Sequence, residues 1–131
     1  METRDTILRL IEQTALILRA FFNSLPLKDK GELTHADFSS SLKTHTALDL
    51  DFLLAIETSE ALQEYVDLHP SFTTENQELL ADLLVAIATK QEGTNAELVH
   101  PYQRLALHLY QGVNQTTQTY DASRQEKIRV L

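Results

Sequence analysis

Apolar residues recur at intervals of three and four along most of the chain, with polar and charged residues between them. Positions with this spacing share one face of an α-helix, so the pattern predicts helices rather than strands. The first such stretch predicts a helix from about Arg4 to Asn23. Leu8, Leu16 and Ile17 widen its apolar face, which predicts that this helix contacts either two neighbouring elements or a second chain.

Hydroxyl and acidic residues mark the starts of the later helices. A Ser or Thr three residues before an acidic or amide side chain is typical of a helix N-terminus, where both side chains satisfy free backbone N–H groups. The residues with this character are Thr34 with Asp37, Thr46 with Asp49, Thr58 or Ser59, Thr74 with Gln77, Thr94 with Glu97, and Ser123 with Glu126. Together with the first helix they predict a compact bundle of about six to seven helices.

The strongest helical pattern begins at Thr74 and ends before Gly93, and its dense leucines predict the most buried element of the fold. A second long helical pattern follows it. Pro101 lies inside this second pattern, and a proline within a helix removes one backbone hydrogen bond and clashes with the preceding turn. Two alternatives remain open at this point: the helix kinks at Pro101, or it begins there.

The composition agrees with helices joined by short polar loops. The chain has 131 residues with only three glycines and three prolines, while Leu, Ala, Glu and Gln are abundant. We predict an all-α fold and a single helical domain over residues 1–131, which is an ordinary domain size. Within it we expect a long N-terminal helix at 1–25. At 74–131 we expect an antiparallel helix pair followed by a capping helix, the layout of one helical repeat.

Four patches of sequence resemble short bacterial all-helical proteins whose C-terminal half is tetratricopeptide-like. The patches are TILRLIEQ at 6–13, LLADLL at 79–84, LALHLY at 105–110 and RQEKI at 124–128. The resemblance implies a helical fold with tetratricopeptide-like helices at 74–131. It carries over no functional residue, because the proteins that it points to have no assigned activity.

Acidic residues concentrate in the middle of the chain, whose net charge is −8. From Glu32 to Glu97 there are thirteen carboxylates and only two basic residues, Lys43 and Lys90. Binding to nucleic acid requires clustered Lys and Arg, so we expect no nucleic-acid partner. Two interpretations of the acidic segment remain open: a solvated face that keeps the protein soluble, or a binding surface for a basic partner.

Several classes of site and location are excluded by what the sequence lacks. It has no cysteine, which excludes disulfides, thiolate metal sites and cysteine nucleophiles. Its glycines are far apart and form no phosphate-binding loop. No targeting segment and no apolar run of about 20 residues is visible. We therefore expect a cytoplasmic protein that does not enter a membrane and binds no cofactor.

Glu97, His100 and His108 are the candidate metal-binding or catalytic residues. Glu97 and His100 have the E-x-x-H spacing that supplies two ligands to di-iron carboxylate sites. Such a site needs a second copy of the motif, and the sequence has none. A small metal-binding protein or enzyme that uses these three residues is therefore the alternative function. Other short pairs, such as His35 with Asp37, are expected to be solvated loop residues.

Two tyrosines allow two interpretations. Tyr102 and Tyr110 lie eight residues apart, on the same predicted helix as Arg104 and His108. As core residues, the tyrosines fill a helix contact while their hydroxyls reach polar atoms. As binding residues, they line the concave side of the helix pair and contact a peptide, and Arg104 pairs with a carboxylate of the partner.

The sequence contains no complete catalytic set, and its first helix has a wide apolar face. Both features favour a non-enzymatic helical module for protein interaction or self-association. A protein or peptide partner is expected to contact Tyr102, Arg104, His108 and Tyr110. A homodimer through the first helix is the second candidate assembly, with Leu16 in its interface.

Overall fold

All regular structure is helical in residues 4–25, 35–91, 96–118 and 121–131, the residues that the computed structural model describes. The all-α prediction is therefore confirmed, as is the predicted number of helices. None of the described helices is both long and apolar enough to cross a lipid bilayer. The helices are, in chain order, α1 (Arg4–Ser24), α2 (His35–Thr46), α3 (Leu50–Ala55), α4 (Ser59–Asp67), α5 (Thr74–Gln91), α6 (Ala96–Thr117) and α7 (Ala122–Arg129).

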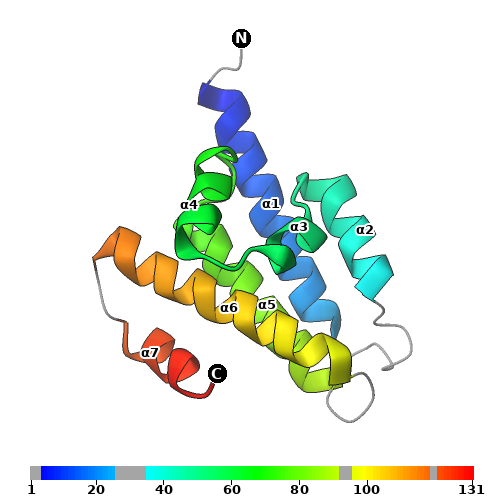
Figure 1. Ribbon diagram of the computed structural model, residues 1–131. Helices are drawn as coiled ribbons and strands as arrows, with labels where there is room; N and C mark the ends of the chain where they lie inside the picture. Colours follow the sequence, from blue (N-terminus) through cyan, green and yellow to red (C-terminus); the bar gives the residue numbers. More distant parts are fainter. Residues whose placement is uncertain (1–3, 26–34, 92–95, 119–120) are drawn as a thin grey trace.

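Helix α5 lies at the centre of the fold (Figure 1). It packs against α1 on one side and against the antiparallel helix α6 on the other. Helix α2 contacts α1 and α3, while α3, α4 and α7 each contact α6. Helices α5, α6 and α7 thus have the order that the pattern predicted for 74–131, a helix pair and a third helix.

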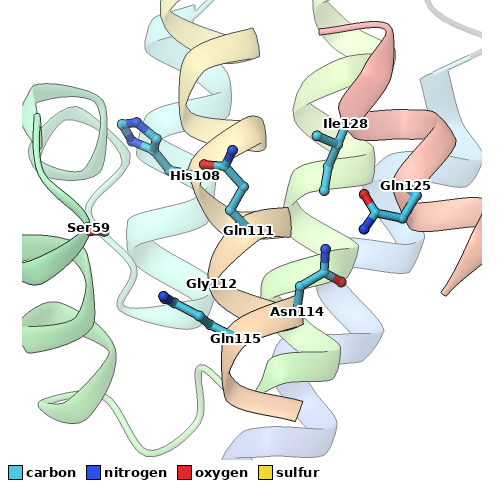
Figure 2. A pocket seen from close by; sticks show the side chains of 8 residues that line it. All are labelled: Ser59, His108, Gln111, Gly112, Asn114, Gln115, Gln125 and Ile128. Carbon is cyan, nitrogen blue, oxygen red and sulfur yellow. The ribbon is translucent and has the colours of Figure 1, made fainter. Parts of the chain in front are cut away.

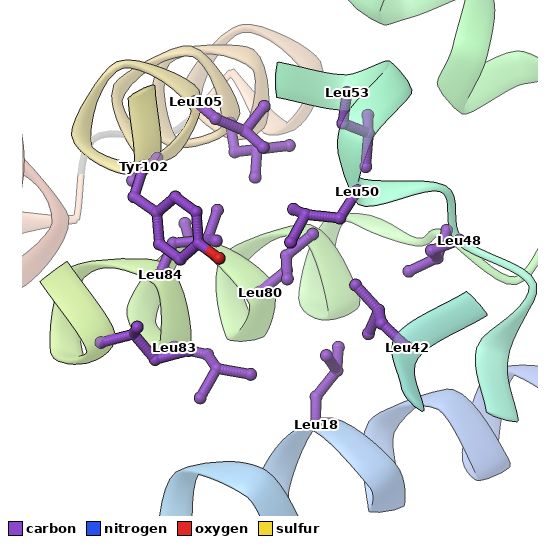
Figure 3. Packing of buried hydrophobic residues seen from close by; sticks show 14 of the residues in the cluster. Leu18, Leu42, Leu48, Leu50, Leu53, Leu80, Leu83, Leu84, Tyr102 and Leu105 are labelled. Atoms are coloured by element: carbon purple, nitrogen blue, oxygen red, sulfur yellow. The ribbon is translucent and has the colours of Figure 1, made fainter. Parts of the chain in front are cut away.

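The hydrophobic core is built mainly on α5 (Figure 3). Nine of the 18 residues of α5 are buried, so it is the most buried long helix, as its leucine pattern predicted. Leu80, Leu83 and Leu84 are fully buried and belong to one cluster with Tyr102 and Leu105 of α6. The opposite side of this cluster comes from α1, α2, α3 and the segment between α2 and α3, through Leu18, Leu42, Leu48, Leu50 and Leu53.

Helix α3 begins after Asp49 rather than at the predicted Thr46. The Asp49 carboxylate accepts a hydrogen bond from the Phe52 N–H at 3.1 Å and thereby caps the helix. Thr46 instead ends α2, where its hydroxyl donates to the Leu42 carbonyl at 2.6 Å. Both residues fit the capping pattern, and only the path of the chain between the two helices selects Asp49.

Two further helix starts differ from the prediction, and one agrees with it. Helix α7 begins after Asp121, which caps the Arg124 N–H, so the predicted Ser123 lies inside the helix. Helix α5 is capped by Thr73 rather than by Thr74. Thr58 caps α4 as predicted. The predicted caps Thr34 and Thr94 lie outside the described residues.

Helix α6 runs through its proline. It begins at Ala96, five residues before Pro101, so the alternative in which the helix starts at the proline is wrong. Because proline has no N–H, one carbonyl of the first turn loses its helical partner. The loss falls at the solvent end of the helix, where water can replace the bond.

The three residues that widen α1 do not share one face. Leu8 and Ile17 are nine residues apart, and at about 100° per residue this places them on opposite sides of the helix. Ile17 is half-buried and lines a hollow beside α2, whereas Leu16 is 67% exposed. Leu8 and Ile17 therefore cannot lie in one flat interface, and α1 contacts both α5 and α2, the first of the two predicted alternatives. Self-association through α1 stays a prediction that rests on Leu16 itself.

Helix α7 is attached in part by charged groups. The Arg124 guanidinium donates to both carboxylate oxygens of Glu78, at 3.2 and 3.0 Å, and to Asn114 Oδ1 at 2.7 Å. Lys127 donates to Asp82 at 2.9 Å. Arg124 is the only residue of the helix that is buried. These ion pairs therefore help to place α7 on α5 and α6, together with Ile128 and Leu131, which pack against the core.

Candidate functional site

A groove lies along the solvent-facing side of α6, between α4 and α7 (Figure 2). Its volume is about 410 Å³. The floor consists of five α6 residues that follow one another at helical spacing: His108, Gln111, Gly112, Asn114 and Gln115. We call this hollow the α6 groove.

The sequence of α6 explains why these side chains face outward. The opposite side of the helix carries its large apolar residues, and Tyr102, Leu109 and Tyr110 are each at most 1% exposed. Because a helix repeats every 3.6 residues, burial of that side turns His108 and Gln115 toward solvent. The floor of the groove is thus a consequence of the packing of α6 on α5.

The walls of the groove come from the neighbouring helices. Gln125 and Ile128 of α7 form one wall, and Ser59 at the start of α4 forms the other. In Figure 2, His108 and Gln115 lie toward α4, whereas Asn114 lies toward α7. Residues 59, 108 and 125 are far apart in sequence, so only the tertiary fold brings these walls together.

The lining of the α6 groove is uncharged and rich in amides. The net charge of the chain is −8, yet none of the described residues that line the groove is Asp, Glu, Lys or Arg. Each Gln or Asn amide offers two N–H donors and a carbonyl acceptor. The side chains of Gln111, Gln115 and Gln125 make no hydrogen bond to the residues that the structure describes, so their amides are available to a ligand.

Gly112 leaves the helix backbone open at the middle of the groove. A Cβ atom added at this position meets no atom within 4 Å beyond its chain neighbours and the nearby backbone of α6. A ligand can therefore approach the backbone of α6 closely here. Because Gly112 also lines the groove, a larger residue at this position is expected to occupy the groove.

Two of the predicted contact residues lie on this face of α6. His108 is in the groove, half-buried, and Arg104 is exposed one turn before it. The Arg104 guanidinium donates to the Leu54 carbonyl at 3.2 Å, which places it at the junction of α6 and α3. Arg104 thus lies one helical turn from His108, outside the residues that line the groove, and retains free donors for a partner.

Tyr102 and Tyr110 are core residues and do not reach the surface. They are 0% and 1% exposed, so of the two interpretations of these tyrosines the structure has the core one. The Tyr110 hydroxyl donates to the Asp82 carboxylate. Burial raises the pKa of both phenols above the ordinary value, so neither supplies a phenolate near neutral pH.

His35 forms a polar cluster that the sequence did not predict. Its Nε2 lies 2.6 Å from Asp51 Oδ1 and its Nδ1 lies 2.7 Å from the Tyr102 hydroxyl. Ser39 donates to the second oxygen of Asp51 at 3.2 Å. The expectation that His35 is a solvated loop residue is wrong, because it is the first residue of α2 and joins α2 to α3 and α6. The partners are 16 and 67 residues away, so no local pattern could have identified them.

The chemistry of this cluster is that of a structural link. A carboxylate only accepts, so Nε2 donates to Asp51, and a neutral ring then accepts the Tyr102 proton at Nδ1. This order of Asp, His and a hydroxyl resembles a nucleophile relay, but the Tyr102 hydroxyl is fully buried and its pKa is raised. The bond from His35 lowers the pKa of Asp51 below the ordinary value. The cluster therefore stabilises the packing of α2 against α3 and α6.

Acid should weaken the contact between His35 and Asp51, and Asp51→Asn should remove this sensitivity to acid because it removes the titrating carboxylate. The lowered pKa of Asp51 means that its ionised form is favoured in the folded state. The ionised carboxylate therefore adds to the free energy of unfolding above the ordinary pKa of about 4, and this stabilisation is lost as the pH falls through the lowered pKa. We expect the Asp51→Asn variant to lose less stability than the parent below about pH 4. Urea denaturation across pH 2.5–7 measures this difference, with Glu57→Gln as a control that removes an exposed carboxylate; equal acid slopes for all three proteins contradict the expectation.

The residues proposed for a metal site are not brought together. His100 and His108 are eight residues apart on one helix, which is about 12 Å along its axis, too far for a shared ion. Glu97 and His100 are exposed at the start of α6. In the part of the chain that the structure describes, no three His, Asp or Glu side chains are grouped for a metal ion.

No family model, curated protein or solved structure matches this chain. The resemblance to short bacterial proteins with a tetratricopeptide-like half thus stays a prediction.

Proposed function

We propose that this chain is a non-enzymatic protein-interaction module that binds a segment of a partner polypeptide in the α6 groove. The helices α5, α6 and α7 act as a tetratricopeptide-like pair with its capping helix, and they present the groove on their outer side. Arg104, one helical turn from His108, pairs with a carboxylate of the partner, and His108 on the floor contacts the bound segment.

One observation carries this proposal: an amide-lined hollow without charge on the surface of an acidic protein. Peptide groups are neutral and carry one donor and one acceptor each, which is what Gln and Asn amides complement. The volume of about 410 Å³ lies within the range of specific ligand sites. Because the described lining has no Asp, Glu, Lys or Arg, peptide binding there does not remove such a charged group from water.

Gly112 supplies the test. Gly112→Phe places a large side chain in the groove; a Cβ atom at this position has no contact within 4 Å, so we expect the helix to accept the substitution while the ring fills the groove. A displayed library of random peptides is selected on the parent protein. We expect enriched peptides that bind the parent and lose affinity at least about tenfold on Gly112→Phe.

Gly112→Ala is the matched control. It adds one methyl group in open space and replaces a glycine inside a helix, so we expect about 0.5–1 kcal/mol of added stability and nearly unchanged peptide affinity. Thermal or urea denaturation measures the stability, and fluorescence anisotropy measures the peptide affinity. Selected peptides that bind Gly112→Phe as well as the parent, or a selection that returns none, overturn the proposal.

A further inference from the structure

The amides on the floor of the α6 groove repeat at a distance that suits one conformation of a peptide. Gln111 and Gln115 are four residues apart, which is about 6 Å along the helix axis. An extended strand presents the N–H and C=O groups of alternate residues on the same edge, at a repeat of about 6.8 Å. Two successive amides can therefore meet alternate residues of an extended chain.

The length of the floor limits how many residues of a bound peptide it can contact. His108 and Gln115 are seven residues apart, about 10 Å, which corresponds to about three residues of strand. The helix repeat of about 6 Å and the strand repeat of about 6.8 Å differ by nearly 1 Å, so two successive contacts can align but further ones cannot. The floor is thus suited to two residues of the ligand that are separated by one.

The lining favours contact with the main chain over contact with side chains. Among the described residues that line the groove, Ile128 is the one large apolar side chain, and no carboxylate, Lys or Arg is present to select a charged side chain. Gly112 lies between the two glutamines, where its missing side chain lets a peptide backbone approach the helix. A Gln amide can accept from an N–H and donate to the C=O of the same ligand residue.

Resting on the proposed function, we infer that the bound segment lies extended along α6, with the main chain of two alternate residues held by the amides of Gln111 and Gln115. The partner is accordingly a linear stretch of polypeptide that has uncharged residues where it crosses the groove. The N–H and C=O of the residue between them point to the opposite edge, away from α6, so they take no part in this pairing.

N-methylation of the most enriched library peptide tests the inference. Each backbone N–H is methylated in turn, which removes one donor and leaves the side chain unchanged. We expect affinity to fall at least about tenfold at two positions that are separated by one tolerant position, as fluorescence anisotropy measures it. In the protein, Gln111→Leu and Gln115→Leu should each weaken binding of the unmethylated peptide by a similar factor. Gln103→Leu, on the same helix outside the groove, should leave the affinity unchanged.

The outcomes separate this inference from the proposed function. Loss of binding at every methylated position indicates a helical ligand, and no loss at any position indicates recognition through side chains; either result overturns the inference while Gly112→Phe still blocks binding. An effect of Gln103→Leu equal to that of Gln111→Leu overturns it too. A selection that yields no peptide overturns both the proposed function and the inference.

Discussion

Replacing Glu78 with Gln should lower the free energy of unfolding by about 3 kcal/mol. Glu78 accepts two hydrogen bonds from Arg124, whose side chain is only 10% exposed. The variant leaves a buried guanidinium without its paired carboxylate and with only the weaker attraction of Asp121 and Asp82, and that penalty exceeds the net contribution of the pair itself. Urea denaturation at neutral pH, with the slope of the transition compared between variants, measures the loss.

The chain contains a matched control for this substitution. Arg129 and Glu126 on α7 also form a two-bond pair, at 3.0 and 2.5 Å, but both side chains are more than half exposed. Glu126→Gln should therefore leave the stability nearly unchanged, because water screens an exposed pair. A Glu78→Gln effect no larger than that of Glu126→Gln contradicts the conclusion that the charged contacts of Arg124 hold α7 in place.

Leu84→Ala should be equally destabilising, by about 3 kcal/mol, for a different reason. Leu84 is 0% exposed in the cluster where α5 meets α6, so its truncation removes apolar contacts and leaves a cavity. The effect should appear as a lower urea midpoint with an unchanged slope. It tests whether α5 is the central element of the core.

Leu16→Ala is the control for the core substitution. Leu16 is 67% exposed on α1, and a truncation there should change the stability of a monomer by less than about 0.5 kcal/mol. Sedimentation of Leu16→Glu at the same concentrations reports on self-association through α1, since a charge in an interface dissociates a dimer. A large stability loss for Leu16→Ala, together with a parent that sediments as a dimer, supports that prediction; a monomeric parent contradicts it.

The pair of substitutions Glu78→Gln and Glu126→Gln also connects stability to the α6 groove. Gln125 and Ile128 form a wall of the groove and belong to α7, the helix that Arg124 attaches to α5. Loss of the Arg124 contact therefore loosens this wall before it unfolds the core. Peptide affinity should decrease in Glu78→Gln and stay unchanged in Glu126→Gln, measured well below the unfolding transition.

Local patterns in the sequence were sufficient for the helices themselves. The period of the apolar residues located α1 and α5 to within a residue of their observed starts, because a helix that buries one face requires that spacing wherever it packs. The leucines of α5 likewise predicted its central position. Caps were less certain: Thr46 and Asp49 both satisfy the pattern, and the choice between them depends on the backbone between α2 and α3.

The candidate site was predicted only in part. His108 and Arg104 were identified as contact residues, and both lie along the outer face of α6. The glutamines that form most of the floor were not, since an exposed Gln on a helix carries no local signal of function. Tyr102 and Tyr110 allowed two interpretations because an aromatic ring with a hydroxyl suits a core as well as a binding surface.

What the sequence determined by itself is the all-α class, the segments that become helices and the side of each that is apolar, because these follow from the spacing of residues within one helix. The tertiary structure decided the pairing of His35 with Asp51 and Tyr102, the attachment of α7 through Arg124, and the assembly of the α6 groove from three helices. Such contacts join residues that are tens of positions apart, and their distances depend on how the helices pack, which the order of apolar and polar residues along one helix does not specify.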